Sequence, residues 1–390
     1  MGPLQGLRVV ELGHALAGPF GGALLGDFGA DVIKIEHPRQ GDSLRDMGPK
    51  LGENSVWWRV TGRNKRSVCI DFKKPEGLSL VQDLLRTADV LIENFRPGVL
   101  DRSGLGWSDL SRLNPRLVML SISGFGSGGP YSERPGFGKI AEAFSGATHL
   151  TGQADAPAVH PGYSLGDATT GLMGAFGVMV ALQERDRSGK GQLIDLALYE
   201  SLLRMIEWQV PLKQMLGWEA HRKGNQFPFE DAFLTDICAT ADDSDIVVSA
   251  ATTKALDAIR RLLTDEDVIG PSSGTTAEMA AALRDWVAKR PREEALRLLR
   301  ERDIVAGPVY SASDIIADEH IAARQNLVSV PDVTGADVLM PNVVPKLETT
   351  PGSVRWAGPA LGQHSDEVLT ECLALSEAEL AELRADGVIR

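Results

Sequence analysis

The first 120 residues predict an α/β fold with a parallel, Rossmann-like sheet. Short apolar runs typical of strands alternate with segments whose apolar residues recur at helical spacing. Strands that alternate with helices of this length favour units in which a helix connects two parallel strands. No GxGxxG fingerprint follows the first strand, where the chain reads GHALAGP. The pattern therefore predicts a Rossmann-like sheet and counts against a nicotinamide oxidoreductase.

The elements can be assigned in chain order. Strands are expected at residues 8–12, 31–36, 67–71, 90–93, 117–122 and 192–197, and helices at 18–28, 75–87, 168–187 and 198–216. The stretch 121–131 is rich in Gly and Ser and is expected to be a loop. The helix at 168–187 contains several glycines close together, which implies that another backbone packs closely against it, either from a second subunit or from a neighbouring strand of the same core.

The pattern of the sequence changes after about residue 225, where amphipathic helices follow one another, and this indicates a smaller domain. A strand at 246–249 and amphipathic helices at 253–263, 277–289 and 292–302 are expected there. The tail has strand-like turns rich in Pro and Gly and a helix at 376–385. The predicted domains are a large Rossmann-like domain over residues 1–224, a small α/β domain over 225–325 and a C-terminal part over 326–390.

Composition narrows the class of protein. Forty basic and 53 acidic residues give a net charge of −13, which repels nucleic acid and anionic membranes, so neither is an expected partner. Three scattered cysteines and seven scattered histidines show no metal-ligand spacing and suit a reducing cytosol. The longest nearly apolar stretch, 171–182, is shorter than the roughly 20 residues that cross a bilayer. We expect a cytoplasmic protein without a metal site.

One segment departs from the acidic balance. Between residues 59 and 74 there are six cations and a single acid, Asp71. The cations are Arg59, Arg63, Lys65, Arg66, Lys73 and Lys74. Such a cluster could hold a small anion such as a phosphate, or it could be a solvated basic turn. Charge alone does not separate these two hypotheses.

Asp167, in the sequence GDATTG, stands immediately before the expected long helix. Position alone favours a helix cap, because Asp accepts backbone N–H bonds there and complements the helix dipole. The alternative is a covalent nucleophile, since a carboxylate can divide one difficult group transfer into two easier steps. His14 follows the first strand, where open α/β sheets present ligand-binding loops, although a lone His in a turn is more often structural.

Segments from nearly the whole chain together resemble the class III (CaiB/BaiF) CoA-transferase family. In order they are GLRVVELGHALAGPFGGALLGDFGADVIKIEHP, GRNKRSVCIDFKKPEG, ADVLIENFRPGVLDRSGLG, LNPRLVMLSISGFGSGGPY, LGDATTGLMGAFGVMVALQERDRSGKGQLIDLALYES, AGPVYSASDIIADEHIAAR and PALGQHSDEVL. The resemblance implies a large domain built from both ends of the chain, a smaller domain, and an interlocked homodimer. It also implies acyl-CoA and a free carboxylic acid as substrates, with no tightly bound cofactor.

The family resemblance assigns Asp167 as the nucleophile. Its carboxylate would attack the acyl-CoA carbonyl to give a mixed anhydride, and the released CoA thiolate would then form an aspartyl-CoA thioester. The incoming carboxylate would repeat these steps in reverse. Succinyl-CoA as donor and a dicarboxylate or small organic acid as acceptor would be ordinary for the family.

The resemblance also places CoA contacts on several segments. They are His14, Leu16, Ala17, His37, Ile70, Asp71, Phe72, Lys73, Asn94, Phe95, Arg96, Arg102 and Lys139. Some relatives have an arginine at the position of His37, and the surroundings of Lys139 depart from those in formyl-CoA transferases. Those enzymes carry a run of glycines where this chain has 222–227, which counts against oxalate as the acceptor. Arg222 and Lys223 in that segment could meet a distal carboxylate.

Two rival functions remain open. α-Methylacyl-CoA racemases share the fold but need a His and an Asp as paired acid and base, and Phe137 stands where their His would be. A non-catalytic CoA-binding protein is the other rival. In that protein Asp167 would only cap its helix.

Overall fold

The computed structural model describes residues 2–52, 54–228, 233–270 and 275–390. The chain divides into two compact units. The large unit comprises Met1–Ser145, Gly162–Met205 and His320–Arg390, and the small unit comprises Gly146–Pro161 and Ile206–Glu319. The expected boundaries at residues 225 and 325 lie later in the chain than these, and residues 146–161 were expected in the large domain. The small unit is thus an insertion within the large one.

A six-stranded parallel sheet forms the centre of the large unit, in the order β5-β2-β1-β6-β7-β8. The strands are β1 (Arg8–Glu11), β2 (Asp31–Glu36), β5 (Lys65–Cys69), β6 (Val90–Glu93), β7 (Val118–Ser123) and β8 (Leu193–Ala197). This confirms the predicted α/β fold with a parallel central sheet. Most strands were recognisable because both faces of such a sheet are buried, which makes them rich in Val, Ile and Leu, although β5 begins with Lys65 and Arg66.

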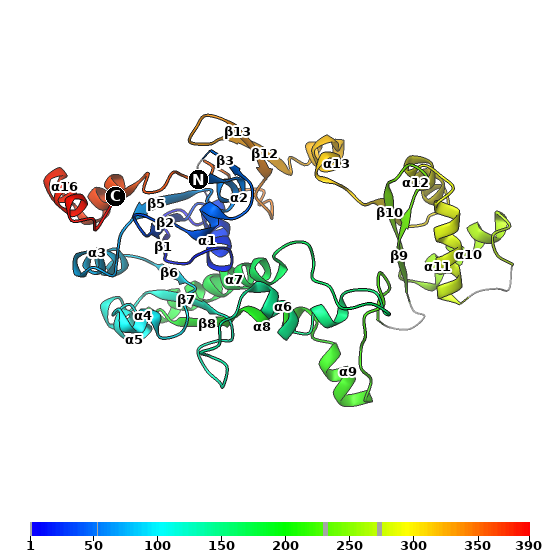
Figure 1. The fold of residues 1–390 in the computed structure, drawn as a ribbon, viewed down its shortest axis with the longest axis horizontal. Helices are drawn as coiled ribbons and strands as arrows, with labels where there is room; N and C mark the ends of the chain where they lie inside the picture. Colours follow the sequence, from blue (N-terminus) through cyan, green and yellow to red (C-terminus); the bar gives the residue numbers. More distant parts are fainter. Residues whose placement is uncertain (1, 53, 229–232, 271–274) are drawn as a thin grey trace. The chain divides into compact units, whose positions relative to one another are not determined.

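Helices cover both faces of this sheet. They are α1 (Ala17–Asp27), α2 (Val56–Thr61), α3 (Pro75–Arg86), α4 (Val99–Arg102), α5 (Trp107–Leu113), α6 (Gly138–Phe144), α7 (Leu165–Ser188), α8 (Leu198–Met205), α15 (Ser365–Leu373) and α16 (Glu377–Ala385). One apolar cluster joins the sheet to α3, α5, α15 and α16, and another joins it to α1 and α7. The C-terminal helices therefore complete the core that the N-terminal strands begin (Figure 1).

Short hairpins complete the large unit. They are β3 (Lys50–Leu51) with β4 (Asn54–Ser55), and β12 (Leu327–Pro331) with β13 (Asp337–Pro341). The short helix α14 (Glu319–Ala323) lies where the chain returns from the small unit.

The glycines of α7 let it pack closely against α1. A Cβ at Gly171 would lie 2.6 Å from the carbonyl oxygen of Ala17 in α1, so no larger residue fits without separating the helices. The close neighbours are thus helix α1 at Gly171 and, as the strand alternative expected, Leu120 of β7 at Gly174. By length and composition α7 is the one described helix that could span a membrane, yet half of it is buried inside the fold.

The expected helix at 198–216 is instead two helices, so this prediction was wrong. α8 ends at Met205 and α9 spans Gln209–Leu216, with the chain crossing into the small unit between them. Pro211 accounts for the break. Proline is tolerated in the first turn of a helix, but in the interior it removes a hydrogen bond and clashes with the preceding turn.

The small unit contains a three-stranded antiparallel sheet in the order β11-β10-β9. Its elements are β9 (Leu234–Ala239), β10 (Asp245–Ala250), α10 (Thr253–Asp265), α11 (Thr276–Val287), α12 (Arg292–Glu301), β11 (Ala306–Pro308) and α13 (Ala312–Ala317). Its apolar core surrounds Trp286, which is 1% exposed. The sequence predicted β10 and the three longer helices, but not β9 or β11.

Four of the six cations between residues 59 and 74 form ion pairs inside the large unit. The pairs are Arg59 with Asp332, Arg63 with Asp27, Lys65 with Glu11, and Arg66 with Asp31 and Glu371. A buried charge is tolerated when it is paired and hydrogen-bonded. For these four cations, both hypotheses drawn from the sequence, an anion site and a solvated turn, were wrong. Lys73 is exposed, and Lys74 donates to the carbonyl oxygen of Asp386.

The contact between α1 and α7 gives a test of the fold. Gly171→Ala should lower the free energy of unfolding by about 1–3 kcal/mol, because the new methyl group overlaps α1. Gly177→Ala in the same helix is the matched control, since a Cβ there meets Ile194 at an ordinary 3.4 Å. That control should be neutral or up to about 1 kcal/mol more stable. Equal urea denaturation curves for the two variants would contradict the close approach.

Candidate active site

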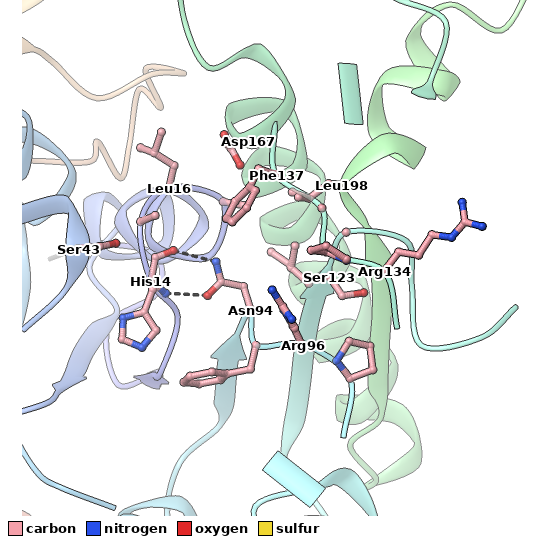
Figure 2. Close-up of a pocket in the computed structure, with 18 residues that line it drawn as sticks. His14, Leu16, Ser43, Asn94, Arg96, Ser123, Arg134, Phe137, Asp167 and Leu198 are labelled. Atoms are coloured by element: carbon pink, nitrogen blue, oxygen red, sulfur yellow. Dashed lines mark hydrogen bonds between the residues drawn. The ribbon is translucent and has the colours of Figure 1, made fainter. Parts of the chain in front are cut away.

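A pocket of about 240 Å³ lies where the loops after β1, β6 and β7 meet the first turns of α6 and α7. Parallel sheets bind ligands at this carboxyl edge. Seven of the predicted site residues line it, and we call it the active-site pocket (Figure 2). They are His14, Leu16, Ala17, Asn94, Phe95, Arg96 and Asp167.

The turn after β1 is held by the side chain of Asn94. The backbone N–H of His14 donates to Asn94 Oδ1 at 2.6 Å, and Asn94 Nδ2 donates to the carbonyl oxygen of His14 at 2.8 Å (Figure 2). One amide side chain thus satisfies both polar groups of one peptide residue, as a neighbouring strand would. This locks the loop after β1 to the loop after β6.

A network of buried charged side chains, Lys34, Asp42 and Glu11, also holds the turn after β1 in place. Lys34 Nζ donates to the carbonyl oxygen of Gly13 and lies 2.7 Å from Asp42 Oδ2 and 3.2 Å from Glu11 Oε1. Asp42 Oδ1 accepts the backbone N–H of Ala15 at 2.9 Å. Ala15 has a φ of +59°, a left-handed conformation that costs a residue with a Cβ about 1–2 kcal/mol. The network therefore stabilises a backbone shape that the turn alone would not prefer.

Burial disfavours the charged forms of Asp42 and Lys34, but the neighbouring groups of opposite charge favour them more strongly. Burial would raise the pKa of Asp42, yet Lys34 and the backbone donors of Leu44 and Ala15 lower that pKa to about 2. Burial would likewise lower the pKa of Lys34, but Asp42 and Glu11 hold it above its usual value. Both groups stay charged at neutral pH, so the turn is held by full charges.

The remaining predicted CoA contacts separate into three groups. His37 and Asp71 line a second cavity, and His37 Nε2 lies 3.9 Å from Asp71 Oδ2. The ring of Phe72 packs edge-on against Phe95, which in turn packs against the ring of His14. Besides Phe72, and Lys139 described below, three residues line neither cavity. They are Ile70, whose side chain is in the core, and Lys73 and Arg102.

Asp167 is the third residue of α7, because the helix begins at Leu165 with Ser164 in the capping position. The expectation that Asp167 precedes the helix as its cap was therefore wrong. The sequence contains a signal for the earlier start, since Ser164 and Asp167 match the S-x-x-D spacing of a capping box, although Ser164 makes no capping bond. Among the described residues, no hydrogen bond or ion pair engages the Asp167 carboxylate.

Two glycines make room for this carboxylate. A Cβ at Gly138 would overlap Asp167 Oδ2, and a Cβ at Gly166 would lie 2.7 Å from the carbonyl oxygen of Gly138. The first turns of α6 and α7 are thus in contact through backbone atoms. A side chain at Gly138 would push the carboxylate aside, and a side chain at Gly166 would separate the two turns.

Glu142 on α6 is a site residue that the sequence reasoning missed. Its side chain is 1% exposed, and Oε1 accepts the backbone N–H of Gly166 at 3.2 Å. Lys139 Nζ lies 3.0 Å from Glu142 Oε2 and donates to the carbonyl oxygen of Tyr163. Lys139 was expected at CoA, but the structure places it outside the pocket lining and against Glu142. Glutamate three residues after lysine looks like an ordinary surface pair, so the sequence carried no specific signal.

These surroundings set the protonation of Asp167. Burial, and then the negative charge of Glu142, raise the pKa of Asp167 to about 6, while Lys139 lowers it. The carboxylate is therefore mostly ionised at neutral pH while it is poorly solvated. An ionised carboxylate that is not bonded to other groups is available to attack an electrophile.

In its described part, the structure supplies no paired base for a racemase, no place for Arg222 in the pocket lining, and no set of metal ligands. Phe137 lines the pocket and is 74% exposed, so that position supplies no proton donor or acceptor. Arg222, expected near a distal carboxylate, donates to the carbonyl oxygens of Gln153 and Ala156 within the small unit. Across the described ranges, no group of three His, Cys, Asp or Glu residues could hold a metal ion.

Comparison with known proteins identifies the relatives of this chain. The family model described as CoA-transferase family III matches residues 4–365. The succinyl-CoA–D-citramalate CoA-transferase of Chloroflexus aurantiacus is 40% identical over 99% of this chain and 98% of its own length. The succinyl-CoA–L-malate CoA-transferase beta subunit of the same organism is also 40% identical over the same shares. The crystal structure of a CaiB/BaiF family protein from Brucella suis superposes with a TM-score of 0.85 at 31% identity, covering 95% of this chain and 99% of that one.

The charges around Asp167 predict opposite effects for two substitutions. Glu142→Gln should lower the pKa of Asp167 below about 6, because it removes a nearby negative charge while an amide oxygen can still accept the Gly166 N–H. Lys139→Met should raise that pKa, because it removes the neighbouring positive charge. The carboxyl carbon resonance of Asp167, in protein labelled with ¹³C-aspartate and assigned with Asp167→Asn, reports the pKa directly. Shifts in the same direction for both variants would show that charge is not the cause.

Proposed function

This chain belongs to CoA-transferase family III, and on that premise we propose that it transfers coenzyme A from succinyl-CoA to a dicarboxylic acid through covalent intermediates on Asp167. One observation carries the proposal. The Asp167 carboxylate faces the active-site pocket without a bonding partner among the described residues, and its pKa of about 6 leaves it ionised at neutral pH.

The proposed reaction balances without an external acid, base or oxidant. An oxygen of Asp167 attacks the thioester carbonyl, the carbon–sulfur bond breaks, and CoA thiolate leaves a mixed anhydride. The thiolate attacks the aspartyl carbonyl, which releases the donor carboxylate and forms an aspartyl-CoA thioester. The acceptor carboxylate attacks that thioester, and the thiolate then attacks the acceptor side of the new anhydride. This last step frees acyl-CoA and regenerates Asp167.

The chain's own residues support this sequence in two ways. The rigid turn at His14, held by Asn94 and the Lys34 network, presents backbone groups beside the pocket. The glycines at the first turns of α6 and α7 let the carboxylate lie directly against the first turn of α6. Preorganised groups of this kind stabilise a transition state without reorganisation during the reaction.

We place CoA between the two cavities of the large unit. The rings of His14, Phe95 and Phe72 contact one another in series and lead from the active-site pocket. His37, Asp71 and the exposed Lys73 would then meet the adenosine end. In this arrangement Ile70 contributes through its backbone, Arg102 lies at the edge of the CoA path, and Lys139 acts on Glu142.

The names of the relatives support the substrate class. Both Chloroflexus aurantiacus enzymes are named for succinyl-CoA, and their acceptors, citramalate and malate, are dicarboxylic hydroxy acids. A donor and an acceptor that each carry a second carboxylate would suit one binding pocket. This is the basis for proposing a dicarboxylate here.

A homodimer belongs to the same proposal. Leu172, Phe176 and Val180 recur every four residues on α7 and are each more than half exposed, which is an unusual apolar stripe for an isolated subunit. A second copy interlocked with the first would cover it. A native mass of about twice 41.9 kDa supports this arrangement, and a monomer contradicts it.

We also propose a cytoplasmic location, because the three cysteines of this chain are free thiols, which a reducing compartment maintains.

Covalent chemistry on Asp167 can be trapped. Incubation with succinyl-CoA and hydroxylamine should yield a hydroxamate on the peptide containing Asp167, detected by mass spectrometry. Asp167→Asn should give no hydroxamate and lose at least about 10³-fold in turnover, because an amide is not a nucleophile. Asp109→Asn, at a partly exposed carboxylate of α5 that lines neither cavity, is the matched control. Absence of any adduct, together with α-proton exchange in D₂O, would instead support the isomerase.

The raised pKa of Asp167 has two measurable consequences. kcat/KM should fall about tenfold per pH unit below pH 6, because only the ionised form attacks, and an acid limb near pH 4 would contradict this. The unfolded-state pKa of this carboxyl is about 3.8, so its ionisation costs stability progressively as pH rises from about 4 to 6. Above pH 6, Asp167→Asn should therefore be about 1–3 kcal/mol more stable in thermal denaturation.

A further inference from the structure

Three residues that line the active-site pocket can carry a positive charge: His14, Arg96 and Arg134. Burial lowers the pKa of His14, so its ring is neutral at neutral pH. The Arg134 guanidinium lies 3.7 Å from the ring centroid of Tyr131 and points away from the pocket (Figure 2). Arg96 points inward and is the cation that this pocket presents to a ligand (Figure 2).

The backbone around Arg96 is fixed, whereas its charge is uncompensated. Asn94 is bonded to the backbone of His14, the Phe95 N–H donates to Glu93 Oε2 at 2.8 Å, and the Val99 N–H donates to the carbonyl oxygen of Arg96. In the described part of the chain, the guanidinium itself makes no hydrogen bond, ion pair or ring contact. A rigid loop that carries a free guanidinium is suited to binding an anion.

Nearby carboxyl groups do not neutralise this charge. Arg96 also borders another cavity, which is lined by Glu93 and Asp101. Burial raises the pKa of Glu93 to about 7, so this group is only partly ionised at neutral pH. No ion pair within 4.0 Å joins Arg96 to either residue in the described structure. The charge is therefore left for a substrate.

We infer that Arg96 binds the distal carboxylate of the dicarboxylic donor and acceptor, and so determines selectivity for dicarboxylic over monocarboxylic substrates. The inference rests on the proposed function, in which the other carboxyl group reacts at Asp167. Burial of a second carboxylate is costly unless a cation pairs with it, and arginine can do so through two parallel hydrogen bonds. The resemblance had assigned Arg96 to CoA itself, a role that would not distinguish one acyl group from another.

Succinyl-CoA and butyryl-CoA provide the test, because their acyl chains have equal length and only succinyl-CoA carries a distal carboxylate. With the same acceptor, Arg96→Gln should lower the ratio of kcat/KM for succinyl-CoA over butyryl-CoA by roughly 10- to 100-fold, the effect of one charged hydrogen-bonded pair. Arg96→Lys should lower this ratio less, because lysine keeps the positive charge but lacks the planar guanidinium that donates two parallel hydrogen bonds. Arg134→Gln, which removes the other arginine of the pocket lining, is the matched control and should not change the ratio.

The outcomes separate the possible roles. A lower ratio in Arg96→Gln but not in Arg134→Gln supports the inference. An unchanged ratio in Arg96→Gln overturns it, whatever the absolute loss, because equal losses for both donors would place Arg96 at CoA. A wild-type enzyme that transfers CoA from neither donor would overturn the proposed function and this inference with it. Thermal melts of each variant establish that the folded protein is being compared.

Discussion

The carboxylate of Glu11, fully buried at the end of the central strand β1, binds lysines from two other strands of the sheet. Lys34 comes from β2 and Lys65 from β5, and both ammonium groups are also fully buried. With Asp42 the four charges sum to zero, which is the condition under which a dry interior accepts them. Because Lys65 also donates to the carbonyl oxygen of Pro19 in α1, the same network positions the first helix. The strand order, the start of α1 and the pocket turn thus depend on one set of ion pairs.

The parts of the fold that the sequence predicted are those in which local pattern and final environment agree. Strands such as 31–36 and 90–93 are buried on both faces and are therefore rich in Val, Ile and Leu. β9 was missed because polarity does not follow burial along it: Asp236 is buried and Ile237 is exposed, so the sequence shows no regular alternation. The break before α9 was missed because Pro211 lies within an otherwise helical sequence.

For the site, single residues were easier to predict than their partners. Asp167 was recognisable as a candidate because its segment is distinctive, although its position within α7 was not. The cations of residues 59–74 were misread because their acids lie far away in the sequence, as with Arg59 and Asp332, which are 273 residues apart. Tertiary structure alone brings such charges together, so a local excess of charge says little about whether it is free. Arg96 is the opposite case: it is an ordinary loop arginine in the sequence, but the fold places it at the pocket without a carboxylate partner among the described residues.

The insertion of the small unit also has a consequence for synthesis on the ribosome. The sheet face formed by residues such as Val68 and Ile70 is covered in part by Val368 and Ile389, and His364 and Ser365 bond directly to β5. At ~5–20 residues per second, roughly 10–30 s pass between translation of Met205 and of this closing segment. During that time the nascent large unit exposes an apolar face while the small unit is made. Until translation ends, this face therefore lacks the C-terminal segment that covers it in the folded protein.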